Sequence, residues 1–81
     1  MNKIKLYTRE LCGWCIEDKD YLRANGIPFE EIDVRDPDAL AEMQRLSGQR
    51  YVPTLVVDGQ QVLANFDVGQ LQEFLQHLKI P

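Results

Sequence analysis

The sequence predicts an α/β fold in which three helices flank one mixed four-stranded sheet, in the order βαβαββα. Three observations predict it. Residues 3–34 carry a strand pattern, a helical pattern and a second strand pattern, as in a βαβ unit. A helix signal then precedes Thr54–Val57, an apolar and β-branched run that ends at the hairpin signal Asp58-Gly59. An amphipathic segment follows the hairpin.

The first half of the chain supplies the βαβ unit. Residues 3–7 alternate polar and apolar side chains, which is typical of a short strand. Residues 15–26 are helical, and Gly26 is a suitable terminator. One helical face carries three side chains and is bordered by two more: Cys15, Lys19 and Leu22, then Ile16 and Tyr21. Residues 27–34 alternate again, so the two strands should be parallel.

The second half begins with a capped helix and ends with another. Asp36-Pro37 is a typical helix start, and Ser47-Gly48 is a typical end. Thr54–Val57 and residues 60–64 should form an antiparallel hairpin around Asp58-Gly59. Asp67 with Gln70 resembles a capping box for the last helix. Its apolar stripe contains five residues: Val68, Leu71, Phe74, Leu75 and Leu78.

Length and charge limit the kinds of partner that we expect. A chain of 81 residues corresponds to one domain, residues 1–81. Its net charge is −4 and its nine Lys and Arg residues are scattered, so we expect no nucleic-acid ligand. No apolar run is long enough for a membrane span or a signal-peptide core. We therefore expect a cytoplasmic protein that does not bind membranes.

Both cysteines of the chain, Cys12 and Cys15, lie in the stretch YTRELCGWC. A structural disulfide between them would close a four-residue loop worth about 2 kcal/mol at best, and it would not persist in a reducing cytosol. Structural zinc needs four ligands, and His77 is the only histidine. A redox dithiol uses this C-x-x-C spacing directly, because one thiolate attacks a disulfide and the other resolves the product. The cysteines alone favour redox chemistry. A zinc site and an incidental pairing of two cysteines remain as alternatives, and the surrounding sequence must decide between them.

The predicted fold places the cysteine pair in the first β-to-α turn, with Cys12 at the start of the first helix. Unpaired backbone N–H groups and the helix dipole favour an anion there. A thiolate is such an anion, and comparable positions lower the pKa of a cysteine from about 8.5 to a range of about 3.5–7.5.

Three segments, YTRELCGWC, GQRYVPTLVVDG and NFDVGQLQEFL, together with the element order, resemble the glutaredoxins over essentially the whole chain. The resemblance implies a thioredoxin-like fold in its minimal glutaredoxin form. It also implies that Cys12 is the attacking cysteine and Cys15 the resolving one. Arg9, three residues before the nucleophile, would favour its thiolate.

The resemblance further implies a surface that binds substrate or glutathione. Pro53 matches a proline that is cis in the family, which would present the backbone of Val52 to an extended peptide or glutathione. Trp14 should lie exposed beside Cys12 as a contact surface for a partner. The remaining members of this predicted binding set are Tyr7, Arg50, Asn65 and Asp67.

Three departures from the common family pattern bear on function. Gly13-Trp14 replaces Pro-Tyr between the cysteines, and a small residue there accompanies family members that hold an iron–sulfur cluster between two subunits. Tyr51 replaces a threonine before Val-Pro and could narrow the glutathione groove. Residues 64–65 are Ala-Asn, where many glutaredoxins have Gly-Gly for the γ-glutamyl end of glutathione. Asn65 should tolerate a left-handed turn.

We therefore expect a monomeric dithiol–disulfide oxidoreductase with no permanently bound cofactor and no metal. Its substrates would be protein disulfides, with ribonucleotide reductase as one candidate, and also glutathione mixed disulfides. Its electrons would come from glutathione or from thioredoxin reductase. The alternative is a module that binds or transfers an iron–sulfur cluster ligated by Cys12 and glutathione.

Overall fold

The computed structural model describes residues 3–10 and 12–80, and in these residues the element order is the predicted βαβαββα. The strands are β1 (Ile4–Thr8), β2 (Glu30–Asp33), β3 (Thr54–Val57) and β4 (Gln61–Ala64). The helices are α1 (Gly13–Ala24), α2 (Pro37–Ser47) and α3 (Val68–His77).

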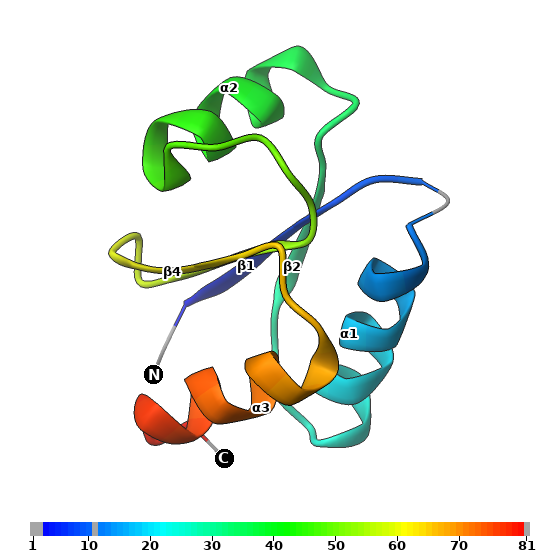
Figure 1. Cartoon of the computed structure of the whole chain (residues 1–81), viewed down its shortest axis with the longest axis vertical. Helices are drawn as coiled ribbons and strands as arrows, with labels where there is room; N and C mark the ends of the chain where they lie inside the picture. The colour runs from blue at the N-terminus through cyan, green and yellow to red at the C-terminus, as the bar shows by residue number, and fades with distance from the viewer. Residues whose placement is uncertain (1–2, 11, 81) are drawn as a thin grey trace.

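The four strands form one mixed sheet in the order β2-β1-β3-β4. β1 and β2 are parallel, whereas β1 with β3 and β3 with β4 are antiparallel. α1 and α3 cover one face of this sheet and α2 covers the other (Figure 1). The predicted parallel βαβ unit and antiparallel hairpin are both confirmed.

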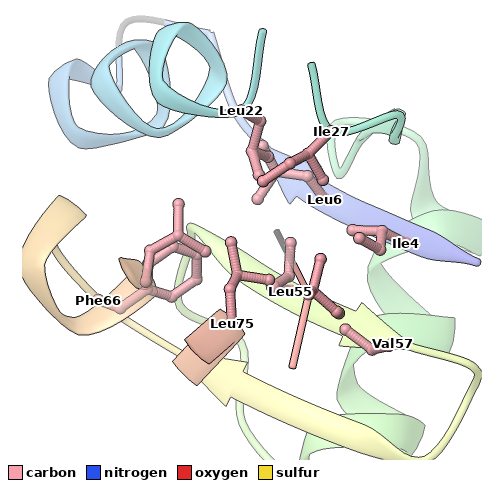
Figure 2. Packing of buried hydrophobic residues seen from close by; sticks show 10 residues of the cluster. Ile4, Leu6, Leu22, Ile27, Leu55, Val57, Phe66 and Leu75 are labelled. Carbon is pink, nitrogen blue, oxygen red and sulfur yellow. The ribbon is translucent and has the colours of Figure 1, made fainter. Parts of the chain in front are cut away.

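The larger core lies between the sheet and the pair α1 and α3. Ile4 and Leu6 of β1 and Leu55 of β3 point to this face because alternate residues of a strand share a side. Figure 2 shows them packed with Leu22 of α1, Leu75 of α3 and other members of the cluster. Phe66, between β4 and α3, is fully buried here.

The smaller core lies under α2. Tyr7 of β1 and Val56 of β3 occupy the strand positions that face α2, and Met43 of α2 packs against them. Both faces of the central strands are therefore buried, which explains why all four residues of β3 are buried and three of them are apolar in succession.

β2 is shorter than the predicted strand over residues 27–34. The preceding residues instead close the end of α1. The Gly26 N–H donates to the Arg23 carbonyl at 3.1 Å and the Ile27 N–H donates to the Leu22 carbonyl at 2.9 Å. This bond pattern, with Gly26 at φ 65°, is a Schellman motif. Ile27 is thereby buried in the core as part of the helix ending.

The buried face of α1 differs from the predicted one. Its buried residues are Cys15, Asp18 and Leu22, whereas Ile16 is 51% exposed. Lys19 lies at the edge of the helix, where its Nζ contacts Glu31 Oε2 of β2 at 2.9 Å. In the part of the chain that the structure describes, no helix is long and apolar enough to cross a membrane.

Candidate active site

Three connecting segments meet at one edge of the sheet. Tyr7 pairs with Thr54, and Thr54 pairs with Ala64, so the C-terminal ends of β1 and β4 flank the first residue of β3. Three segments therefore adjoin the same end of these strands: the β1–α1 turn, the segment entering β3 and the β4–α3 turn. The last two are joined directly, because the Asn65 N–H donates to the Pro53 carbonyl at 2.8 Å.

The β1–α1 turn carries the cysteine pair. Cys12 and Cys15 form a disulfide with their Cα atoms 5.2 Å apart. Cys12 is the N-cap of α1, with φ −94° and ψ 105°, and its Sγ accepts a hydrogen bond from the Cys15 N–H at 3.2 Å. The predicted position of Cys12 at the helix start is thus confirmed. The same N–H and the dipole of α1 would stabilise a thiolate there once the disulfide opens.

The two sulfurs differ in exposure. Cys15 is 1% exposed, whereas Cys12 is half-buried. An incoming thiolate can therefore reach Cys12 and not Cys15, and this asymmetry agrees with the roles that the sequence suggests. Within residues 3–10 and 12–80, no three side chains of His, Cys, Asp or Glu gather where they could hold a metal ion.

Two large aromatic side chains near the cysteine pair and the β3 entrance are exposed. Trp14, between the cysteines, is 52% exposed, and Tyr51, which precedes Val52-Pro53, is 65% exposed. The expected exposure of Trp14 is observed, and its contact with a partner stays a prediction. Gly13 is not needed for space, because a Cβ there would meet nothing within 4 Å.

The segment entering β3 is braced by a glutamine that the sequence analysis did not single out. Gln49 Nε2 donates to Thr54 Oγ1 at 2.9 Å, and Gln49 Oε1 accepts from the Tyr51 N–H at 2.6 Å. Thr54 Oγ1 in turn donates to the Tyr51 carbonyl at 2.7 Å. These bonds hold the segment on which Val52 and Pro53 lie. The Val52–Pro53 peptide bond is cis.

The β4–α3 turn has the conformation expected from its asparagine. Asn65 has φ 55°, in the left-handed region, and is exposed. Asp67 caps α3, because its Oδ1 accepts from the Gln70 N–H at 2.8 Å while Gln70 Oε1 accepts from the Asp67 N–H at 3.0 Å. The predicted capping box is therefore present, and it occupies one carboxylate oxygen of Asp67.

Two basic residues of the predicted binding set lie on the surface. Arg9 is exposed and lies near Asp33, whose pKa is held below its usual value first by hydrogen bonds from Arg35 and then by nearby positive charges that include Arg9. Arg50 is exposed beside the end of α2. The influence of Arg9 on the Cys12 thiolate and the contribution of Arg50 to binding stay predictions.

Tyr7, a member of the predicted binding set, lies in the core. Its side chain is fully buried under α2, and its hydroxyl donates to Glu42 Oε1. Burial and the neighbouring Glu42 carboxylate raise the pKa of the Tyr7 hydroxyl well above its usual range. The reason is strand alternation, because Tyr7 shares the α2 face of β1 with Lys5 while Leu6 faces α1.

Asp18 is the residue of this region that the sequence analysis missed. It is fully buried on α1, and neither carboxylate oxygen has a hydrogen-bond partner among the described residues. Burial, and then the negative charges of Glu17 and Asp67, raise its pKa to about 7. The spacing Cys15, Asp18, Leu22 was the available signal, because steps of three and four place side chains on one helical face.

Comparison with known proteins agrees with this geometry. The family model described as glutaredoxin matches residues 4–62. A glutaredoxin of Neisseria meningitidis is 39% identical over 75 residues, which cover 90% of this chain and 88% of the relative.

Solved structures share the fold as well, which confirms the predicted thioredoxin-like fold class. The crystal structure of the thioredoxin-like protein BC3987 has a TM-score of 0.80 and 35% identity, over 90% of this chain and 100% of that one. The NrdH-redoxin of Escherichia coli, described as a glutaredoxin-like protein with a thioredoxin-like activity profile, has a TM-score of 0.70 and 32% identity, over 88% of this chain and 92% of that one. This chain, with its C-x-x-C pair at the start of α1, belongs to the glutaredoxin family.

Proposed function

We propose that the protein is a dithiol oxidoreductase that reduces disulfides of other proteins, with Cys12 as nucleophile and Cys15 as resolving thiol. The observation that carries the proposal is the asymmetric pair at the start of α1. One cysteine is accessible at a helix N-terminus, and the other is 1% exposed within bonding distance of it. A dithiol that cycles between two states needs both features, because only one sulfur meets the substrate.

The reaction passes two electrons to the substrate in two exchanges. The Cys12 thiolate attacks one sulfur of the substrate disulfide, so that a mixed disulfide forms and the first substrate thiolate leaves and takes a proton. Cys15 then attacks Cys12 Sγ as a thiolate after losing its proton. The second substrate thiol is released, and the Cys12–Cys15 disulfide of this structure forms. A donor dithiol, or two molecules of glutathione, returns the pair to its reduced state.

Two exposed aromatic side chains support a protein substrate rather than a small disulfide. Trp14 lies between the cysteines and Tyr51 lies in the segment that enters β3, and such side chains contribute strongly to protein–protein contacts. They are rigid, and each can bury apolar area on a partner that docks over the cysteine pair.

We further propose thioredoxin reductase as the preferred electron donor. The β4–α3 turn, where the resemblance places the γ-glutamyl end of glutathione, carries Asn65 in place of glycine. Asp67 already uses one carboxylate oxygen to cap α3. The structural relative described as having a thioredoxin-like activity profile supports the same donor.

A paired assay tests both parts of the proposal. Reduction of a protein disulfide such as that of insulin is followed by NADPH consumption, with thioredoxin reductase in one cuvette and glutathione with its reductase in another. We expect turnover in the first that is lost in Cys12→Ser. Turnover only in the cuvette with glutathione and its reductase would refute the donor assignment. The absence of turnover in both cuvettes would refute the enzymatic proposal. The visible absorption spectrum of anaerobically purified protein is the control that shows whether an iron–sulfur cluster is bound.

A further inference from the structure

A fully buried carboxyl group lies one helical turn after the resolving cysteine. Asp18 and Cys15 are 0% and 1% exposed and lie on the same face of α1. Residues three apart on a helix have Cβ atoms about 5–6 Å apart. Helical side chains also lean toward the N-terminus, so Asp18 leans toward the turn that holds Cys15.

The surroundings of Asp18 do not neutralise a negative charge. Burial raises the pKa of Asp18 most, and the negative charges of Glu17 on its own helix and Asp67 at the start of α3 raise it further. The basic residue next to it on α1, Lys19, is paired with Glu31 on β2. Leu22 one turn later on α1, with Phe66 and Leu71 from the α3 side, belongs to the apolar core. A buried carboxyl without hydrogen bonds is costly, so a structural role explains its presence poorly.

Cys15 needs a proton partner in each direction of the reaction. When a thiolate opens the Cys12–Cys15 disulfide at Cys12, Cys15 leaves as a thiolate in a place that water reaches poorly. When the mixed disulfide on Cys12 is resolved, the Cys15 thiol must lose its proton before it attacks. Charged sulfur in an apolar setting is unfavourable, so a nearby acid or base lowers both barriers.

We propose that Asp18 is this proton partner, giving a proton to Cys15 Sγ when the disulfide opens and taking it back when the disulfide closes. On opening, the donor sulfur bonds to Cys12, the Cys12–Cys15 bond breaks, and the Asp18 acid passes its proton to the Cys15 thiolate. This leaves a Cys15 thiol and an Asp18 carboxylate. On closing, the carboxylate takes the Cys15 proton, the Cys15 thiolate bonds to Cys12, and the substrate thiolate leaves.

Asp18 is therefore a positioning and proton-transfer residue that acts through Cys15 and does not touch the substrate. The inference rests on the proposed thiol–disulfide exchange, since it assigns a role within that cycle. It predicts that the Cys12–Cys15 disulfide of the oxidised protein is reduced fastest when Asp18 is protonated. Because the pKa of Asp18 in this oxidised state is about 7, the effect falls in an accessible pH range.

The test is the single-turnover reduction of the oxidised protein by dithiothreitol, followed through the fluorescence of Trp14, the one tryptophan of the chain. The observed rate is divided by the concentration of dithiothreitol thiolate at each pH. For the wild type we expect this corrected rate constant to fall as the pH rises through about 7. Asp18→Asn should be at least about 10-fold slower at pH 6 and show no such inflection. Asp18→Glu should restore the inflection.

Asp20→Asn, which removes an exposed carboxylate from the same helix, is the matched control and should keep the wild-type profile. If Asp18→Asn folds and keeps the wild-type rate and pH profile, the inference is wrong. If it does not fold, the infrared band of a protonated carboxylic acid in oxidised wild type decides. That band should be present at pH 5 and lost by pH 8, and its absence at pH 5 overturns the inference.

Dithiothreitol replaces both the physiological donor and the protein substrate, so the two proposals can fail separately. A wild type that shows the inflection but reduces no protein disulfide would refute the proposed function only. A wild type that reduces protein disulfides with a flat profile would refute the role of Asp18 only.

Discussion

The buried carboxyl of Asp18 should make the oxidised protein less stable as the pH rises. Folding raises the pKa of this group from 3.8 to about 7. Between pH 3.8 and about pH 7, Asp18 therefore keeps its proton in the folded state and has lost it in the unfolded state. The stabilisation is complete below about pH 4 and is lost as the pH rises through 7. Each pKa unit corresponds to about 1.4 kcal/mol, so a rise of about three units gives about 4 kcal/mol of lost stability.

Replacement of Asp18 by asparagine removes this titration and keeps the size of the side chain. Asp18→Asn and wild type should unfold with similar free energies at pH 4. By pH 8 the variant should be more stable by up to about 4 kcal/mol. The paired carboxylates Glu31 and Glu42 have pKa values below their usual range, so their contributions change at lower pH and cancel in the comparison.

Urea unfolding of the oxidised proteins at each pH from 4 to 8 measures this difference, with Asp20→Asn as the matched control. The control should follow the wild type at every pH, because Asp20 is exposed. Parallel curves for Asp18→Asn and wild type would refute the reasoning, since they would show that Asp18 titrates alike in the folded and unfolded chains.

Substitutions at three further positions test the structure around the site. Asn65→Gly should leave the free energy of unfolding unchanged or raise it slightly, whereas Asn65→Ala should lower it by about 1 kcal/mol, because φ is 55° there; equal effects in thermal melts would contradict the left-handed turn. Tyr7→Phe should lower the free energy of unfolding by about 1–2 kcal/mol through loss of the hydrogen bond to Glu42, and it should leave disulfide reduction unchanged. A loss of activity at unchanged stability would show that Tyr7 takes part in the reaction. Asp67→Ala should cost about 1 kcal/mol in urea unfolding through loss of the α3 cap, and no measurable cost would show that the cap contributes nothing.

The elements of the fold were predictable because each has a local signal. The caps Asp36 and Asp67, the hairpin Asp58-Gly59 and the alternating pattern of β1 depend only on neighbouring residues. Cys12 at the start of α1 followed from the same local logic. Asn65 in a left-handed turn followed from the side-chain chemistry of asparagine.

Local sequence patterns did not predict the positions of several side chains, because these positions depend on packing between helices and strands. Tyr7 sits at the end of a strand, and only the placement of α2 over that face of the sheet buries it. Asp18 was not singled out, because a carboxylate rarely lies in a core, although its spacing from Cys15 and Leu22 fits the buried face. Gln49 braces a segment whose path the sequence does not reveal. Such failures of local rules are expected at functional sites.

The most direct test of the central claim is a trapping experiment with the two single-cysteine variants. Cys15→Ser keeps the accessible nucleophile and lacks the resolving thiol, so it should accumulate a mixed disulfide with a protein disulfide substrate, visible by intact mass spectrometry and reversed by dithiothreitol. Cys12→Ser keeps only a thiol that is 1% exposed in the wild-type structure, and it should form no such adduct. Equal trapping by both variants, or trapping by Cys12→Ser alone, would contradict the assignment of Cys12 as nucleophile and Cys15 as resolving thiol.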